Sequence, residues 1–456
     1  MSTVLIVTLG TSPEPIINCI SSLRPDRVVF LCSNESQKLV EVVLSKVPLP
    51  DFQTERDVVV LQQRLSGKTN NALENELDQL DRVYLRTLEL LTHVREQDPH
   101  CRIIADYTGG TKTMTTGLAM AAIDDSDVVL HLTVSDRSGG QASLGGYSAP
   151  VAVSTAAIHA CRLRERELPA LLKRYDYEAA RQAVRRVRAI TGPDPGTLQW
   201  LQKLEALLVG LDAWDRFDHR HAYEVLQGLC DRRLNETLLF PLKRVIGSRR
   251  QLDTEAEAQR WPQMKGHGLE AIEDLLRNAE RRAAQERYDD AVGRLYRAME
   301  LTEQLLLKVG VCDQVGAEGI LTGGVDLERL PATIQSNWRN KASRSQSDPG
   351  LAKGKVLKIG LAEGFDLLGD LGHPTGHEWV KRRSELVNAI KIRNDSLFAH
   401  GFRPIGYSGW RELNAQLGGF LKSAVQQHRK SKGSRSGDAE PIPQLPNSLA
   451  NLLPDG

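Results

Sequence analysis

The sequence lacks the long apolar run that a membrane-spanning helix needs. No stretch of it approaches the roughly 20 apolar residues that cross a bilayer. The first residues also lack the basic, then apolar, then small-residue order of a secretory signal. We therefore expect a cytoplasmic protein that does not bind membranes, and its 456 residues are enough for two or three domains.

Paired cysteines and a strong net charge are also missing. The six cysteines are scattered without a C-x-x-C pair, which predicts free thiols in a reducing compartment and no zinc site. The 59 Lys and Arg residues nearly balance the 58 Asp and Glu residues, so the net charge is only +1. A globally basic nucleic-acid binder is excluded, and any RNA must bind to local positive charge.

Positive charge gathers in two segments. Residues 339–358 hold six Lys or Arg and one acid, and we expect a mobile loop that either steers RNA or is simply solvated. Residues 428–432 (HRKSK) open a stretch rich in Pro, Ser and Asn. We expect residues 426–456 to form a disordered tail.

The first 155 residues have the pattern of a parallel α/β sheet. Helix-like segments at 72–95 and 113–123 alternate with short apolar runs at 3–9, 27–32, 57–61, 102–106 and 127–134. Buried strands that alternate with helices predict a doubly wound, Rossmann-like sheet. Ligands of such sheets bind at the carboxyl ends of the strands.

Two loops at predicted strand ends suit a phosphate or a nucleotide. Residues 8–12 (TLGTS) follow the first strand, and residues 106–114 (DYTGGTKTM) lead from a strand into a helix. Paired glycines allow close approach of a ligand, and a helix N-terminus favours an anion. A glycine turn with a threonine N-cap would explain the conformation but not the added Lys112 and hydroxyl groups. A Walker A loop and a G-x-G-x-x-G motif are both absent, which argues against an ATPase or a dehydrogenase.

The middle of the chain, residues 156–267, is predicted to be a helical connector. Strand signals end here, and three similar segments combine an aromatic residue and an Asp with an early Ala, at residues 175–180, 217–222 and 287–292. They predict helical hairpins weakly like tetratricopeptide repeats, although their spacing is too irregular for a true array. A peptide-binding role is the alternative to a plain connector.

A third pattern, Arg393-Asn394 followed by His400, has the residue types that RNA cleavage through the 2′-hydroxyl requires. A guanidinium can hold a phosphate and an imidazole can move a proton. Helical periodicity over residues 384–398 predicts that Arg393 and His400 project from nearly the same helix face, about 10 Å apart. The alternative is structural: Arg393 pairs with a surface carboxylate and His400 caps the helix.

The two N-terminal loops resemble those of the CRISPR-associated Rossmann-fold (CARF) domain, a dimeric sensor of cyclic oligoadenylates. The Gly-Gly-Thr-Lys-x-Met element at 109–114 is the most specific part of this resemblance. The resemblance implies that the ligand is bound by Gly10, Thr11, Ser12, Asn34, Thr108, Gly109, Gly110, Thr111 and Lys112. Some CARF domains cleave their own ligand, for which Thr11, Thr111 and Lys112 are the candidates here.

The Arg393-to-His400 pattern resembles the HEPN ribonuclease motif, in which an Arg and a His are separated by four to six residues. The resemblance implies a helical bundle over residues 268–425 that dimerises and completes its groove with two Arg/His sets. HEPN domains often place an acid on the first long helix, here residues 289–308, so Glu300, or less well Glu303, is expected to pair with Arg393.

With both resemblances taken together, the chain is similar to the CARF–HEPN ancillary nucleases of type III CRISPR systems. This implies a homodimeric, metal-independent endoribonuclease that uses no cofactor, is activated by a cyclic oligoadenylate and cleaves single-stranded RNA. His400 would act as general acid or base, Arg393 would stabilise the phosphorane and Asn394 would orient both. The alternative is a non-catalytic sensor or adaptor whose helical half binds a protein or nucleic acid.

Overall fold

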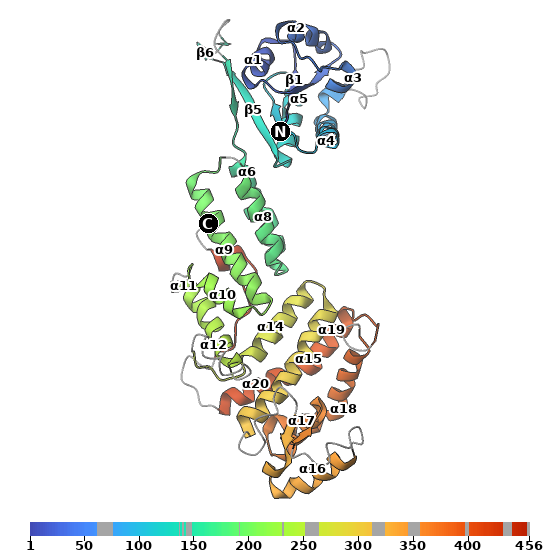
Figure 1. The fold of residues 1–456 in the computed structure, drawn as a ribbon, viewed down its shortest axis with the longest axis vertical. Helices are drawn as coiled ribbons and strands as arrows, with labels where there is room; N and C mark the ends of the chain where they lie inside the picture. The colour runs from blue at the N-terminus through green and yellow to red at the C-terminus, as the bar shows by residue number, and fades with distance from the viewer. Residues whose placement is uncertain are drawn as a thin grey trace. The chain divides into compact units, whose positions relative to one another are not determined.

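The computed structural model describes twelve segments of the chain: residues 1–61, 76–135, 137–138, 141–142, 148–190, 192–229, 232–250, 264–311, 324–344, 356–396, 401–431 and 440–453. They fall into two compact units, shown in Figure 1. The N-terminal unit contains Met1–Leu163 and Val184–Leu201, and the helical unit contains Arg164–Ala183 and Gln202–Gly456. The predicted connector is thus divided between the two units rather than forming a unit of its own.

A six-stranded sheet lies at the centre of the N-terminal unit. Its order is β3-β2-β1-β4-β5-β8, and the first five strands are parallel while β8 is antiparallel to β5. The strands are β1 (Thr3–Leu9), β2 (Arg27–Ser33), β3 (Val58–Leu61), β4 (Arg102–Asp106), β5 (Val128–Ser135) and β8 (Ser148–Ala152). The predicted Rossmann-like α/β fold is confirmed, with an additional antiparallel edge strand.

Alternate residues of each strand supply the cores on the two faces of this sheet. Leu5 and Val7 of β1 pack in one core with Ile16 and Ile20 of α1, whereas Ile6 packs in the other core. One face is covered by α1 (Glu14–Leu23) and α2 (Leu39–Lys46), and the other by α4 (Leu80–Gln97) and α5 (Lys112–Asp124). Both faces are apolar because both are buried, which explains the uninterrupted apolar runs in the sequence.

Shorter elements complete the N-terminal unit. They are α3 (Thr54–Asp57), β6 (Arg137–Ser138), β7 (Gln141–Ala142) and α6 (Ala156–Arg162). Two longer helices, α8 (Tyr177–Ala189) and α9 (Pro195–Asp215), run through residues of both units.

Three turns with a left-handed residue join helices into hairpins in the helical unit. Tyr175, Phe217 and Glu286 have φ angles of 55°, 65° and 62°, a conformation that ends helices. The hairpins are α7 (Leu168–Lys173) with α8, α9 with α10 (His219–Leu226), and α14 (Glu270–Ala284) with α15 (Tyr288–Leu305). The three similar sequence segments therefore do mark hairpins, but the third turn is at Glu286, before the aromatic residue.

The remaining helices pack on α15 around one apolar core. Phe365 stacks on Trp379 with ring centroids 4.9 Å apart and meets Phe420 edge-on at 5.3 Å. These helices are α17 (Leu361–Asp370), α18 (Pro374–Asn394), α19 (Tyr407–Leu413) and α20 (Gly419–Ser431). The predicted helical bundle is confirmed.

Two features differ from the prediction of a mobile loop at residues 339–358 and of a purely helical C-terminal region. Arg339 to Arg344 lie on α16 (Ala332–Arg344), and Lys358 lies on a strand, so these parts are not a loop. That strand, β10 (Val356–Lys358), pairs with β9 (Gly324–Asp326). Residues 345–355, with the rest of the predicted basic loop, lie outside the described residues.

The predicted disordered tail is wrong for its described part. Helix α20 continues to Ser431, and residues 440–453, which we call the C-terminal strap, bury Ile442, Leu445 and Leu452 and end in α21 (Leu449–Leu452). The Tyr177 hydroxyl donates a hydrogen bond to the Pro446 carbonyl at 2.7 Å. Prolines remove backbone donors from the strap but not its carbonyls, so neighbouring side chains bind it instead.

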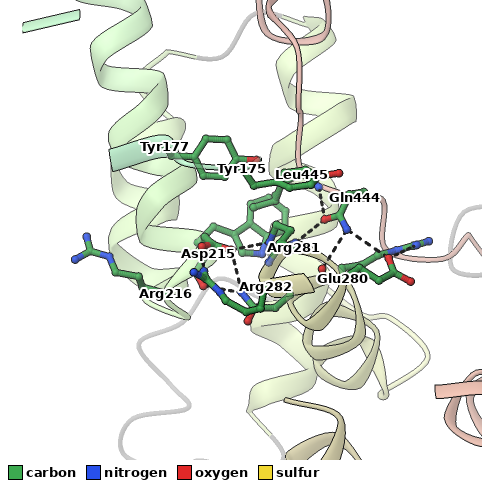
Figure 2. A network of polar contacts seen from close by, with 12 residues as sticks. Tyr175, Tyr177, Asp215, Arg216, Glu280, Arg281, Arg282, Gln444 and Leu445 are labelled. Carbon is green, nitrogen blue, oxygen red and sulfur yellow. Dashed lines mark hydrogen bonds and ion pairs between the residues drawn. The ribbon is translucent and has the colours of Figure 1, made fainter. Parts of the chain in front are cut away.

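Below the strap lies a buried network of charged residues (Figure 2). Asp215, at the end of α9, accepts from Arg281 Nε at 2.6 Å and from Asn278 at 2.9 Å, and it also pairs with Arg282. Arg281 reaches Gln444 of the strap at 2.7 Å. The network therefore ties α9, α14 and the strap together. Two further helices of this unit are α11 (Arg232–Leu234) and α12 (Phe240–Arg249).

Candidate functional site

The helix that carries Arg393 ends earlier than the sequence predicts. Helix α18 stops at Asn394, Ser396 N donates to the Arg393 carbonyl at 2.9 Å, and Ser396 forms a β-bridge with Arg403. The run Asn394-Asp395-Ser396 explains this, because these side chains compete for backbone hydrogen bonds and favour helix ends. The expectation of one helix over residues 384–398 is therefore wrong at its C-terminal end.

His400 lies outside the described residues, but the segments on either side of it are described. The amide of Gly401 donates to the carbonyl of Ser396 at 3.3 Å, and Arg403 N donates to the Asp395 carbonyl at 3.1 Å. A Cβ at position 401 would stand 2.0 Å from the Asp395 carbonyl oxygen, so only glycine fits this contact. The chain that follows His400 in the sequence is thus fixed against the end of α18.

Arg393 itself lies over an aromatic ring. Its guanidinium carbon is 3.9 Å from the centroid of Tyr296, which projects from α15, and Nη1 donates to Asn394 Oδ1 at 3.3 Å. The structure thus brings together two of the three predicted catalytic residues, Arg393 and Asn394. Sequence reasoning missed Tyr296, although the long helix that carries it was expected to face Arg393.

The two acids expected near Arg393 have other surroundings. Glu300 forms an ion pair with Arg297 at 3.0 Å. Glu303 is buried against Gly364, where a Cβ would stand 1.9 Å from its Oε1, and burial together with the charge of Glu300 raises the pKa of Glu303 to about 8. Glu303 is therefore a largely neutral core residue at pH 7, which does not suit it to pair with Arg393.

In the N-terminal unit the two predicted loops meet at the centre of the sheet. Strand β1 lies between β2 and β4, and the chain leaves it toward opposite edges, which is the switch point where doubly wound sheets bind ligands. A Cβ on Gly10 would stand 2.8 Å from the amide nitrogen of Gly110, and one on Gly109 would stand 2.4 Å from the Thr8 carbonyl oxygen. Gly110 also has a φ of +93°. The glycines are thus required for the two loops to touch.

A buried aspartate that the sequence did not single out supports the second loop. Asp106 is fully buried and accepts hydrogen bonds from Thr108 N at 2.9 Å, Thr133 Oγ1 at 2.9 Å and Cys19 Sγ at 3.5 Å. Burial and the neighbouring Asp106 raise the pKa of the Cys19 thiol far above its ordinary value, so Cys19 stays protonated and can donate. A strand-end aspartate before paired glycines was the available sequence signal.

The predicted ligand-binding residues differ in exposure. Gly10, Thr108, Gly109 and Gly110 are half-buried in the contact between the loops, and the exposed set is Thr11, Ser12, Asn34, Thr111 and Lys112. Two hydroxyls have structural duties: Thr111 Oγ1 accepts from Met114 N at 3.2 Å as an N-cap, and Thr108 Oγ1 accepts from Thr133 N at 2.6 Å. Thr11, Ser12, Asn34 and Thr111 lie in loops that follow β1, β2 and β4, and Lys112 is the first residue of α5.

Two kinds of feature are absent from the described residues. No group of three or more His, Cys, Asp or Glu in this part of the chain is placed to hold a metal ion. Among the same residues, no helix has both the length and the apolar character to cross a bilayer.

Comparisons with known proteins find similarity in one domain and in the fold. Residues 263–423 match the family model described as the Csm6 HEPN domain. The fold is similar to that of Enterococcus italicus Csm6, solved with cyclic hexa-2'-fluoro-hexa-dAMP, at a TM-score of 0.55 and 14% identity over 96% of this chain and 97% of that chain. No curated protein gives a match. Residues 263–423 are thus similar to the Csm6 HEPN domain, and the chain shares the fold of Csm6 over nearly its whole length.

Proposed function

We propose that the chain is a metal-independent endoribonuclease that cleaves single-stranded RNA when a cyclic oligoadenylate binds its N-terminal unit. The observation that carries this proposal is the placement of Arg393 and Asn394 at the end of α18, inside the region matched by the HEPN domain. The charge of an arginine held at a helix end suits an RNA phosphate.

The proposed reaction is an internal transesterification. His400 removes the proton of a 2′-hydroxyl, or protonates the leaving 5′-oxygen, and the 2′-oxygen attacks the adjacent phosphorus. Arg393 stabilises the negative charge of the phosphorane, and Asn394, which accepts from Arg393 Nη1, keeps the guanidinium oriented. The P–O5′ bond breaks, and the products are a 2′,3′-cyclic phosphate and a 5′-hydroxyl.

The glycine loops at the switch point support the proposed activator site. Gly10 and Gly110 touch, so the ligand would lie across both loops against exposed Thr11, Ser12 and Lys112. Lys112 opens α5, whose N-terminus favours a phosphate. A homodimer would present two such sites to one cyclic ligand and two Arg393–His400 sets to one RNA. Binding energy that differs between two dimer states is what would switch the nuclease.

The proposal is tested by cleavage of a labelled single-stranded RNA in EDTA, with no activator and then with cyclic tri-, tetra- and hexa-adenylate. The hexa-adenylate is tried first because Enterococcus italicus Csm6 was solved with an analogue of that ring. We expect cleavage with one ring only and a 2′,3′-cyclic phosphate on the product. A DNA of the same sequence is the control, because it lacks the attacking hydroxyl.

His400→Ala and Arg393→Ala are the decisive variants. Both should bind the activator as the wild type does, since they lie in the helical unit, and both should lose cleavage. If one ring binds tightly but no ring activates cleavage, the nuclease proposal is overturned in favour of a sensor that acts through a binding partner.

A further inference from the structure

The contact between Arg393 and Tyr296 joins the end of α18 to the middle of α15. The separation of 3.9 Å between the guanidinium carbon and the ring centroid is well within the about 6 Å over which an aromatic face attracts a cation. Both side chains are half-buried, so water screens the attraction only in part. The ring therefore influences both where the guanidinium lies and how its plane is oriented.

Tyr296 is a neutral partner at physiological pH. Burial raises the pKa of its phenol above the ordinary value, and nearby Glu300 raises it further, against the opposing effect of Arg393. A neutral ring attracts a guanidinium through its π electrons and does not cancel the positive charge, whereas a carboxylate forms an ion pair. Contact with Tyr296 thus orients Arg393 without neutralising it.

The acid on the same helix forms an ion pair of its own. Glu300 lies one turn beyond Tyr296, and its Oε2 is 3.0 Å from Nη1 of Arg297. On the other side of the contact, Asn394 Oδ1 accepts from Arg393 Nη1 at 3.3 Å. The ring face and the amide hold the guanidinium from two different directions.

We propose that Tyr296 is a positioning residue for Arg393, with its ring face holding the guanidinium in the orientation that meets the phosphate of single-stranded RNA. The inference rests on the proposed function and adds to it a residue that lies outside the Arg393–His400 motif. Tyr296 acts through Arg393 and does not touch the reacting atoms. Because a catalytic group displaced by about 1 Å can cost about 10²-fold in rate, loss of the ring should slow the cleavage step.

The experiment compares Tyr296→Phe with Tyr296→Leu in the full-length protein at saturating activator, measuring kcat and KM for a labelled RNA. Phenylalanine keeps the ring face, so its kcat should stay within about threefold of the wild type. Leucine keeps apolar bulk but no ring, and its kcat should fall by about 10²-fold with a much smaller change in KM. Activator affinity and melting temperature are measured alongside, and Tyr296→Met is a second ring-free variant in case leucine impairs folding.

Two controls separate positioning from general packing. Tyr223 is a half-buried tyrosine of α10 whose ring lies 5.6 Å from Lys243 Nζ, so Tyr223→Leu removes a similar contact that is not near Arg393 in sequence and should leave cleavage unchanged. In an Arg393→Ala background, Tyr296→Leu should cause no further loss, because two residues that act as a unit are not additive.

The outcomes are distinct. A wild type that never cleaves RNA overturns the proposed function and this inference together. A wild type that cleaves, with Tyr296→Leu and Tyr296→Met equally active, overturns the inference alone. The inference is also overturned if Tyr296→Leu slows the Arg393→Ala protein by the same factor as the wild type, or if phenylalanine fails to retain activity.

Discussion

Two arginines of the helical unit are held in opposite ways. Arg281 is fully buried, with its Nε 2.6 Å from Asp215 and its Nη1 2.7 Å from the Gln444 side chain (Figure 2). Arg393 is half-buried at the end of a helix, and its guanidinium lies over the Tyr296 ring. One arginine meets carboxylates inside the core, while the other meets a neutral ring.

This difference shows that the partner of an arginine indicates whether the arginine has a structural or a functional role. Burial lowers the pKa of Arg281, and the carboxylates of Asp215 and Asp274 offset that cost, so its charge is used within the fold. A ring partner offsets part of the cost of desolvation but leaves the net charge in place. An arginine of the second kind is suited to meet an external anion.

The largest expected effect on stability comes from a substitution of Arg281, the structural arginine of this comparison. Arg281→Met should destabilise the helical unit by about 3–5 kcal/mol, because it breaks the buried ion pair with Asp215 and leaves Arg282 beside that carboxylate. Urea unfolding followed by tryptophan fluorescence measures it. Arg216→Met is the matched control, since Arg216 is 68% exposed in its pair with Asp212 and should cost less than about 1 kcal/mol. Equal losses for both variants would mean that burial does not set the importance of Arg281.

On the functional side, Arg393→Ala should lower RNA cleavage by about 10²–10³-fold, the usual cost of removing one group that stabilises transition-state charge. Thermal melting should change by only a few degrees, because Arg393 is half-buried at a helix end whereas Arg281 is fully buried in the core. Cleavage rate and melting temperature are measured on the same preparation. If the Arg393→Ala variant is unstable but still active, Arg393 has a structural role like that of Arg281.

Glu303→Gln should make stability less dependent on pH. The folded carboxyl has its pKa raised to about 8, whereas the unfolded one ionises near its ordinary value of about 4.5. The unfolded chain therefore releases its proton first, and the wild type loses stability as the pH rises from about 5 to 8. The glutamine variant should gain up to a few kcal/mol at pH 8, since each pKa unit is about 1.4 kcal/mol, and little at pH 4.

This prediction is tested by measuring the melting temperatures of the wild type and of Glu303→Gln between pH 4 and pH 8. The exposed Glu412 supplies the control, because Glu412→Gln should shift melting by a similar small amount at every pH. A wild-type melting temperature that rises between pH 5 and pH 8 relative to Glu303→Gln would contradict the burial argument.

The smallest expected effect concerns the C-terminal strap. Tyr177→Phe removes the hydrogen bond to the Pro446 carbonyl and should cost about 1 kcal/mol. Hydrogen exchange of residues 440–453 should then be about fivefold faster, because the strap opens more often. Tyr407→Phe, at a side chain that is 60% exposed, should leave that exchange unchanged.

The sheet and its loops were predictable from the sequence because their signals are local. Continuous apolar runs indicate strands buried on both faces, and the glycines at 10, 109 and 110 are needed where two loops touch. The helix end at Asn394 was missed because apolar Leu397 and Phe398 continue the helical periodicity, while the competing Asn, Asp and Ser act only through backbone hydrogen bonds.

The contacts that sequence could not predict join residues that are distant in the chain. Tyr296 on α15 contacts Arg393 on α18, and the periodicity of neither helix predicts this contact. The strap was predicted to be disordered from its Pro, Ser and Asn content, yet Ile442, Leu445 and Leu452 are buried. Composition averages over a segment, whereas a few well-spaced apolar residues are enough to fix it to a surface that folds elsewhere.

The strap also determines when, during synthesis of the protein, some contacts of the helical unit can form. The bond between Tyr177 and Pro446 spans 269 residues, which a ribosome adding roughly 5–20 residues per second takes about 13 to 54 s to make. Until then Tyr177 lacks the Pro446 carbonyl and Arg281 lacks the Gln444 side chain. Tyr177 on α8 and Arg281 on α14 must therefore wait, without these strap contacts, until residues 440–453 have been synthesised and can pack over them.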